Sequence, residues 1–406
     1  MTPIVFVAPY FLPATLRFVE AVARLDGVRM GLVSTDPAEK LPPALRHHVA
    51  AHWRIDDCLD ADQVVAAVIA LADRIGRPSR LVGTLEELQV PLAVARERLG
   101  IHGLGAEAAA NFRDKARMKR VLAAAGLPCA RHRLAPSTAE ATAFAAEVGY
   151  PLVVKPPAGA GARNTFRVDD AAQLEATLAA APPSAREPVL LEEFITGEEH
   201  SFDAVVVDGQ PRWHSISRYM PGPLEVLRTA WIQWCVVLPR DIAGPEYAPI
   251  RDAGFAALDR LGLSTGLAHM EWFKTPRGGV AISEVGARPP GAQFTSLLSW
   301  AHDVDFYATW ARLAALEQFD APERKYAVGC AYLRGQGPGH VRGVAGLDKV
   351  ARAVGGLVVE ARLPQPGQAK SGTYEGEGYV ILRHPETRVV EEGLATVVTG
   401  LEVELA

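Results

Sequence analysis

The stretch HMEWFKTPRGGVAISEVGARPPG, residues 269–291, places two glutamates inside apolar runs of the kind that form buried strands. A turn centred between Arg277 and Gly278 joins the runs as an antiparallel hairpin, with a loop of two residues (277–278) or four (276–279). In this register Glu271 lies directly opposite Glu284, with Cβ atoms about 4.5–5.5 Å apart. Alternation along each strand puts the following residues on one face: His269, Glu271, Phe273, Ile282, Glu284, Gly286 and Arg288.

Two carboxylates in such a position repel each other unless something neutralises them. One of them can hold a proton, Arg288 can pair with one, or a divalent cation can lie between them. Hard cations such as Mg²⁺ take carboxylate oxygens together with substrate phosphates. A hairpin whose glutamates simply face solvent is the alternative, and the motifs elsewhere in the chain decide between these interpretations.

The whole chain has 406 residues, enough for two to four domains. Its composition is that of a globular protein, with 49% hydrophobic and 22% charged residues and a net charge of −5. There is no basic block, so we expect no nucleic-acid partner. No apolar run reaches the ~18 residues of a membrane span, so we expect no membrane partner. Four cysteines without a CxxC motif indicate free thiols and a cytoplasmic location.

Residues 1–110 alternate apolar strand-like and amphipathic helical segments, which predicts a parallel sheet covered by helices. The first strand-to-helix turn, APYFLPATL, lacks GxGxxG, which disfavours a dinucleotide site. His47, His48 and His52 resemble a metal cluster, but no cysteine or carboxylate completes the set, and a solvated helix or loop is favoured. The tail from residue 323 has its own strands and a last helix, which predicts a separate domain.

Residues 153–168, VVKPPAGAGARNTFRV, put Lys155 at a strand end and Gly159 and Gly161 in the loop that follows. Glycines let backbone N–H groups approach phosphate oxygens, although a plain hairpin is also consistent with the pattern. Lys115 in FRDKARMKR is either a second phosphate ligand or a solvated helix charge.

Residues 190–203, LLEEFITGEEHSFD, follow an apolar strand with acidic residues and Gly197. Such a segment suits a hinge, where a backbone edge meets a planar base and a carboxylate meets ribose hydroxyls.

The order of these elements resembles the ATP-grasp superfamily: DK, a strand lysine with a glycine loop, EEFI-x-G-x-E, a carboxylate, and then E-x-x-x-R. The motifs cover residues 111–292. The resemblance implies an N-terminal α/β domain (1–112) and an ATP-grasp fold of two α+β subdomains. The smaller of these carries the glycine loop (113–198) and the larger one the metal site (199–322). A small C-terminal α+β domain (323–406) completes the chain.

The resemblance also assigns roles. Arg288 would be catalytic, stabilising charge on an acyl phosphate and its tetrahedral adduct, and Glu271 and Glu284 would ligate Mg²⁺, with Mn²⁺ as the alternative ion. Glu192 would meet the adenine amino group and Glu199 the ribose hydroxyls, with His200 as a further candidate. The residues implied to bind ATP are Lys115, Lys155, Gly159, Gly161, Glu192, Glu193, Phe194, Ile195 and Glu199.

HMEW and EVGAR look like the bacterial L-amino acid ligase branch, which joins a carboxylate to an amine, here expected to be amino acids. One departure is Gly286, where many ATP-grasp enzymes have the asparagine of E-x-N, so the number of metals stays open. A carboxylase using carboxyphosphate and a nucleotide-binding module without catalysis are the alternative functions. The resemblance is compatible with a homodimer but does not determine the oligomeric state.

Three further residues have two interpretations each. Arg218, in an expected mobile loop, is either a carboxylate clamp or a surface residue. Trp231 and Trp234 either line an acceptor pocket or belong to the core.

Overall fold

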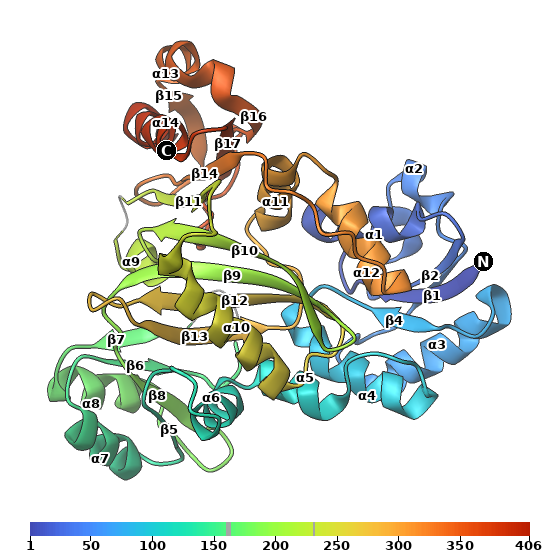
Figure 1. Cartoon of the computed structure of the whole chain (residues 1–406), viewed down its shortest axis with the longest axis horizontal. Coiled ribbons are helices and arrows are strands. Elements are labelled where there is room, and N and C mark those ends of the chain that lie inside the picture. The colour runs from blue at the N-terminus through green and yellow to red at the C-terminus, as the bar shows by residue number, and fades with distance from the viewer. Residues whose placement is uncertain (160–163, 230–231) are drawn as a thin grey trace.

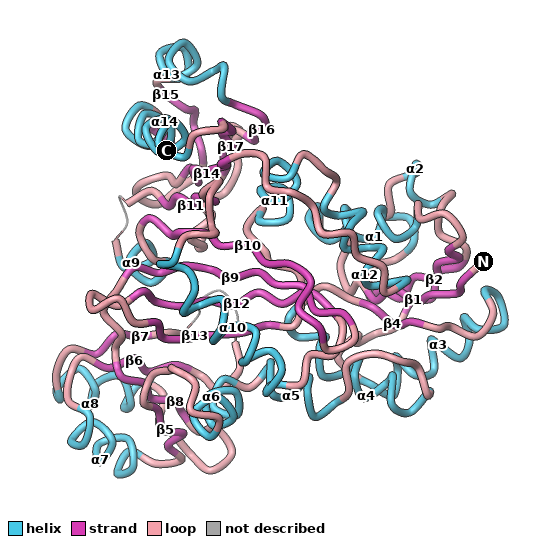
Figure 2. The backbone as a smooth tube through the Cα atoms, viewed as in Figure 1, coloured by secondary structure: helices cyan, strands magenta, loops and turns pink. Residues whose placement is uncertain are grey.

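The computed structural model describes residues 1–159, 164–229 and 232–406, whose strands form four sheets. Figure 1 shows the N-terminal region on one side of a long antiparallel sheet, a smaller unit below it and the C-terminal region above it. Figure 2 shows that helices flank these sheets. The expected fold class, a parallel-sheet α/β region followed by α+β units, is confirmed. Within the described part of the chain, no helix is both long and apolar enough to cross a membrane.

The N-terminal region has a parallel sheet in the order β3-β2-β1-β4, as the alternating pattern predicts. Its strands are β1 (Thr2–Val7), β2 (Val28–Ser34), β3 (Ala51–Arg54) and β4 (Arg80–Val82). Its helices are α1 (Pro13–Ala23), α2 (Pro43–Arg46), α3 (Ala61–Ile75), α4 (Gln89–Leu99) and α5 (Ala106–Arg113), with short 3₁₀ turns η1 (Ala38–Lys40) and η2 (Glu86–Leu88).

The histidines of this region do not form a metal site. His52 lies in β3, not in a helix or loop, and its Nε2 is 2.7 Å from the Oγ of Ser34. His47 and His48 are exposed. Within the described residues, no group of three or more His, Cys, Asp and Glu side chains is disposed to hold a metal ion.

The smaller unit is an antiparallel sheet in the order β5-β8-β6-β7. Its strands are β5 (His132–Ala135), β6 (Leu152–Lys155), β7 (Phe166–Val168) and β8 (Val189–Glu193), and its helices are α6 (Lys115–Ala124), α7 (Thr138–Val148) and α8 (Ala171–Ala180). The predicted cap of α7 is present, since the Ser137 hydroxyl accepts from the Glu140 N–H at 3.3 Å.

The large sheet is antiparallel, in the order β13-β12-β9-β10-β11-β14-β17-β16. Its strands are β9 (Glu198–Val207), β10 (Gln210–Met220), β11 (Trp234–Leu238), β12 (Gly266–Lys274), β13 (Val280–Gly286), β14 (Ala327–Leu333), β16 (Val358–Arg362) and β17 (Gly378–His384). Helices α9 (Pro223–Arg228), η3 (Pro245–Tyr247), α10 (Ala248–Leu261), α11 (Phe294–His302) and α12 (Phe306–Leu316) accompany it. The tail adds β15 (Val341–Ala345), α13 (Leu347–Val354), η4 (Gly355–Leu357), α14 (Thr387–Gly400) and β18 (Glu402–Leu405).

Packing crosses two of the expected domain boundaries. Strand β14, from the tail, pairs with β11 along its length, so the large sheet continues through residue 323. Helix α12 packs on α1, where Phe18 contacts Tyr307 and Trp310 with ring centroids 4.8 and 4.9 Å apart. One buried hydrophobic cluster therefore joins the N-terminal sheet to the large sheet, which fixes the two walls of the site relative to each other.

Candidate active site

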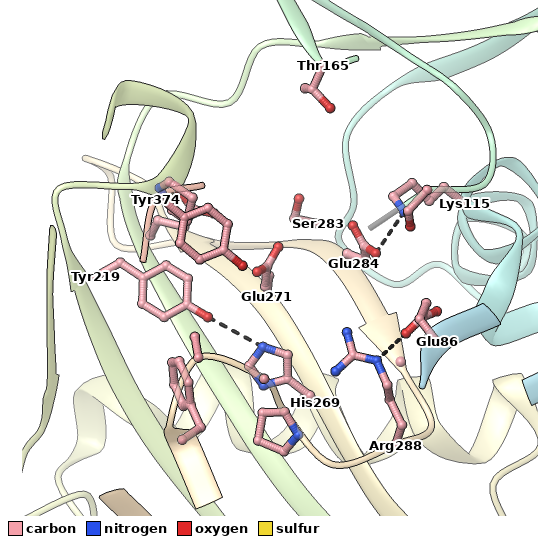
Figure 3. A pocket seen from close by; sticks show the side chains of 18 of the residues that line it. Glu86, Lys115, Thr165, Tyr219, His269, Glu271, Ser283, Glu284, Arg288 and Tyr374 are labelled. Atoms are coloured by element: carbon pink, nitrogen blue, oxygen red, sulfur yellow. Dashed lines mark hydrogen bonds and ion pairs between the residues drawn. The ribbon is translucent and has the colours of Figure 1, made fainter. Parts of the chain in front are cut away.

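A cavity of about 490 Å³ lies where the N-terminal region, the smaller unit, the large sheet and the C-terminal tail meet. Apart from His200, its wall includes every described residue for which the sequence analysis expects a role in binding ATP or metal, and Arg288 as well. Figure 3 shows Glu271 at the centre of the cavity, with Glu284 and Lys115 on one side and Tyr219 and Tyr374 on the other. Gly161 is the one expected residue that lies outside the described residues.

The hairpin of β12 and β13 brings the two glutamates together as predicted. Glu271 pairs with Glu284, and the large sheet holds both strands because Glu271 also pairs with Ser201 of β9. The predicted loop lengths are wrong: Lys274 pairs with Val280, so five residues, 275–279, form the loop.

A β-bulge reconciles this loop with the correct register. Ser283 is the extra residue between two pairs, Glu271 with Glu284 and Trp272 with Ile282. Ile282 therefore joins the buried cluster of Trp272 and no longer alternates regularly with Glu284. Both Ile282 and Ser283 border the cavity.

Lys115 neutralises one of the two glutamates. Its Nζ lies 2.8 Å from Oε1 of Glu284, and both side chains are largely buried. Burial favours the neutral form of Glu284, but the charges of Lys115 and Lys155 outweigh it and hold the pKa of Glu284 below its usual value. Burial, followed by the charge of Glu284, raises the pKa of Glu271. The ionised form is therefore favoured at Glu284, whereas at Glu271 it is disfavoured unless a proton or a further cation offsets the charge.

A divalent cation bound between Glu271 and Glu284 would balance the charge of this pair. Two acidic side chains at adjacent positions supply hard oxygen ligands, and the raised pKa of Glu271 shows that its anionic form is poorly stabilised without a further cation. Since no third acidic, His or Cys side chain of the described chain completes a metal group, phosphate oxygens and water would supply the remaining ligands.

A third lysine beside the site, Lys119, escaped the sequence analysis. Lys155 and Lys119 flank the buried Glu192, with Nζ–Oε distances of 2.9 and 3.4 Å. Burial opposes ionisation of Glu192, but the two lysines hold its pKa below the usual value. Lys119 is fully buried and lies four residues after Lys115 in α6, so helical spacing puts both on the cavity side. That i, i+4 spacing was the available signal.

The glycine loop begins against α6. The carbonyl of Gly159 accepts from Lys115 Nζ at 3.0 Å and from Arg113 Nη1 at 3.2 Å. The N–H of Lys115 in turn donates to the carbonyl of Pro157 at 2.8 Å. The start of the loop is therefore held against Lys115 and Arg113, and Gly159 lines the cavity.

The expected hinge lines the same cavity. The N–H groups of Glu193 and Phe194 donate to the carbonyls of Arg131 and Pro151 at 2.9 and 3.2 Å, so neither is available to a ligand. The Glu193 carboxylate binds Arg131, at 2.7 Å from its Nε. The N–H of Ile195, the third hinge residue, donates to no backbone carbonyl of the described residues and is therefore available to a ligand.

Glu199 lies beyond the hinge on β9, and its carboxylate rests against the backbone of Gly222. Burial, followed by the charge of Glu271, raises the pKa of Glu199 well above its usual value. Its neighbour His200 is buried and stacks on Trp272, with centroids 4.5 Å apart, so it faces away from the cavity.

Arg288 is held by a residue from the N-terminal region. Its Nε donates to the carboxylate of Glu86 and its Nη1 to the carbonyl of Pro289 at 2.8 Å. A Cβ at Gly286 would lie 3.2 Å from Glu86 Oε2, so this carboxylate occupies space that a side chain at position 286 would need. The glycine in place of asparagine therefore has a structural reason, which the sequence alone did not reveal.

Arg218 is not in the site. It lies in β10 and pairs with Val237 of β11, so the expected mobile loop is wrong at this residue. Its guanidinium binds Glu391 of α14. Trp234 is both core and lining, since its side chain is buried and borders the cavity, whereas Trp231 lies outside the described residues.

The comparisons with known proteins agree with this geometry. Residues 114–212 match the family described as "Carbamoyl-phosphate synthase L chain, ATP binding domain". The chain is 28% identical over 380 residues to the uncharacterized protein y4rH of Sinorhizobium fredii, covering 91% of this chain and 76% of that one. It is 26% identical over 258 residues to the L-arginine-specific L-amino acid ligase of Bacillus subtilis, covering 61% of each chain.

The fold has a close counterpart among solved structures. The L-amino acid ligase of Bacillus licheniformis superposes with a TM-score of 0.80 over 100% of this chain and 99% of that one, at 19% identity. The family match, the relatives and the fold support the class of ATP-dependent ligases and, within it, the ATP-grasp superfamily.

Proposed function

We propose that this protein activates a substrate carboxylate as an acyl phosphate with ATP and couples it to an amine, forming an amide such as a dipeptide. The observation that carries the proposal is the order of groups in one cavity. Lys115, Lys119 and Lys155 lie at one end, the opposed Glu271 and Glu284 follow, and Arg288 lies beside them.

The lysines and the hinge would bind ATP. Lys115 and Lys155 would contact the phosphates, with Gly159 in the loop above them. Lys119 adds a third ammonium group that borders the cavity. The adenine would lie along the hinge, where the Ile195 N–H can donate to a ring nitrogen, and Glu199 would accept from ribose hydroxyls.

The chemistry consists of two displacements. The substrate carboxylate attacks the γ-phosphorus of ATP, forming an acyl phosphate and releasing ADP. The amine then attacks the acyl carbon and, after losing a proton, leaves as an amide while inorganic phosphate departs. Mg²⁺ held by Glu271 and Glu284 would neutralise charge on the transferring phosphoryl group. Arg288 supplies a fixed donor to the oxyanion of the tetrahedral adduct, and Glu86 holds it in place.

Amino acids are the substrate class that the ligase relatives favour. Two alternative functions are outcomes of the test below. One is a carboxylase that uses carboxyphosphate, and the other is a nucleotide-binding module without turnover. The chain has both glutamates of the expected metal site, three cavity lysines and a partly buried arginine, a set that a module without catalysis does not need.

The test is phosphate release from Mg-ATP with the twenty standard amino acids, supplied singly and in pairs, followed by mass spectrometry of the products. Release that requires a pair, with a product mass equal to the two amino acids less one water, would establish the ligase. Release that instead depends on bicarbonate would favour the carboxylase. Absence of release under every condition would contradict a catalytic function on amino acids.

A further inference from the structure

An aromatic wall closes the cavity on the side of Glu271 away from the lysines (Figure 3). Trp234 contacts Tyr219 and Tyr374, with ring centroids 5.5 and 4.6 Å apart, and Tyr219 contacts Phe294 at 5.9 Å. All four side chains line the cavity. Tyr374 comes from the C-terminal tail, so residues far apart in the sequence meet here.

The residue after Tyr374 brings a carboxylate to this wall. Glu375 lines the cavity and is partly buried. Glu284, Glu86 and Glu192 each have a lysine or arginine beside them, whereas no arginine, lysine or histidine of the described chain lies within ion-pair distance of Glu375. Burial accordingly raises the pKa of Glu375. A carboxylate in such a position gains from a cation supplied by a ligand.

The backbone around Glu375 is held in place. The carboxylate of Glu377 accepts from the N–H groups of Gly335 and Ser371 at 2.6 and 2.7 Å. Gly376 has φ +65, and a Cβ there would lie 2.3 Å from the carbonyl oxygen of Leu333, so only glycine fits the turn. The position of Glu375 is therefore fixed by the fold.

Trp234 is 1% exposed and supplies an aromatic face beside Tyr219 and Tyr374. The wall thus presents at Glu375 a carboxylate without a cationic partner among the described residues, next to aromatic faces that favour cations.

We propose that Glu375, with Tyr374 and Trp234, forms the binding site for the ammonium group of the amine substrate, which is an amino acid. This inference rests on the proposed function and adds to it the class and the location of the second substrate. The ammonium group would bind the carboxylate of Glu375 and lie against the aromatic faces of Tyr374 and Trp234. Once the carboxylate of Glu375 has accepted one proton from this ammonium group, the neutral amine would attack the acyl carbon from the side opposite to the lysines. Loss of a second proton from nitrogen and departure of inorganic phosphate would complete the amide.

The test compares two nucleophiles in wild-type protein and in Glu375→Gln. One is the amine identified in the amino-acid panel, which is cationic at pH 7.5. The other is hydroxylamine, which is largely uncharged at that pH and traps acyl phosphates as coloured hydroxamates. We expect Glu375→Gln to raise KM for the amino acid amine at least about tenfold. Hydroxamate formation and KM for ATP and for the carboxylate substrate should stay within about twofold of wild type.

Two further variants guard against a loss of folding. Glu375→Asp keeps the charge and should recover part of the lost affinity. Glu404→Gln removes an exposed carboxylate from β18 and should change nothing. An unchanged KM for the amine in Glu375→Gln would overturn the inference, as would a rise confined to the carboxylate substrate. Absence of hydroxamate in wild-type protein would instead contradict the proposed function itself, so the two failures are distinguishable.

Discussion

Replacing Arg288 by alanine tests what the buried pair between the metal hairpin and the N-terminal region does. The side chains of Arg288 and Glu86 are 21% and 8% exposed. Removing one partner of a buried ion pair costs about 3–5 kcal/mol, because the other charge is left uncompensated. Since Arg288 is partly exposed, we expect Arg288→Ala to lower the free energy of unfolding by about 3 kcal/mol, the lower end of that range.

The effect on turnover should be separable from the effect on stability. Loss of a donor aimed at a developing oxyanion lowers kcat by about 10²–10³-fold. The lysines that would bind the phosphates keep their partners, so ATP affinity should stay close to that of wild type. Phosphate release with saturating substrates measures kcat, urea unfolding measures stability, and calorimetric titration measures ATP affinity.

The double variant Arg288→Ala/Glu86→Gln is the decisive control. It removes the stranded charge of Glu86, so most of the lost stability should return, whereas turnover should remain as low as in Arg288→Ala. Recovery of turnover together with stability would refute a catalytic role, because the defect would then lie only in folding. Unchanged turnover in the single variant would refute it as well.

Lys119→Met should raise the Kd for ATP at least about tenfold, because it removes a buried cation beside Glu192. The control variant Lys349→Met, on the exposed face of α13, should leave the Kd unchanged in the same titration. Glu284→Gln should raise the Mg²⁺ concentration for half-maximal phosphate release at least about tenfold, and an unaltered Mg²⁺ dependence would remove Glu284 from the metal site. Arg218→Ala should lower stability by less than about 1 kcal/mol and leave the KM of both substrates unchanged; a higher KM for the carboxylate would return Arg218 to the site.

The part of the site that the sequence predicts is the part carried by contiguous motifs. Lys155 precedes its glycine loop, and Glu284 and Arg288 lie four residues apart, so local spacing alone identifies them. Glu86 and Glu375 could not be found in this way. They reach the cavity from a 3₁₀ turn near the N-terminus and from a loop of the tail, and only tertiary packing brings them there.

The expected division into domains shows the same limit. Strand patterns identify β14 and β17 within the tail, but an isolated strand pattern does not say which sheet a strand joins. Pairing of β14 with β11 extends the central sheet into the tail and thereby carries Tyr374 and Glu375 to the aromatic wall. A tail that folded as a separate body would not supply residues to the cavity.

The register of the metal hairpin was predicted correctly although its turn was not, and the reason lies in burial. Met270 and Trp272 are fully buried on one face of β12, and Val285 is buried beside them on β13. A slip by one residue would expose these side chains and turn the glutamates into the core, at a cost far above that of any loop. The five-residue loop alone would produce that slip, and the bulge at Ser283 removes it. Burial of the apolar face therefore sets the register, and the loop and the bulge adjust to it.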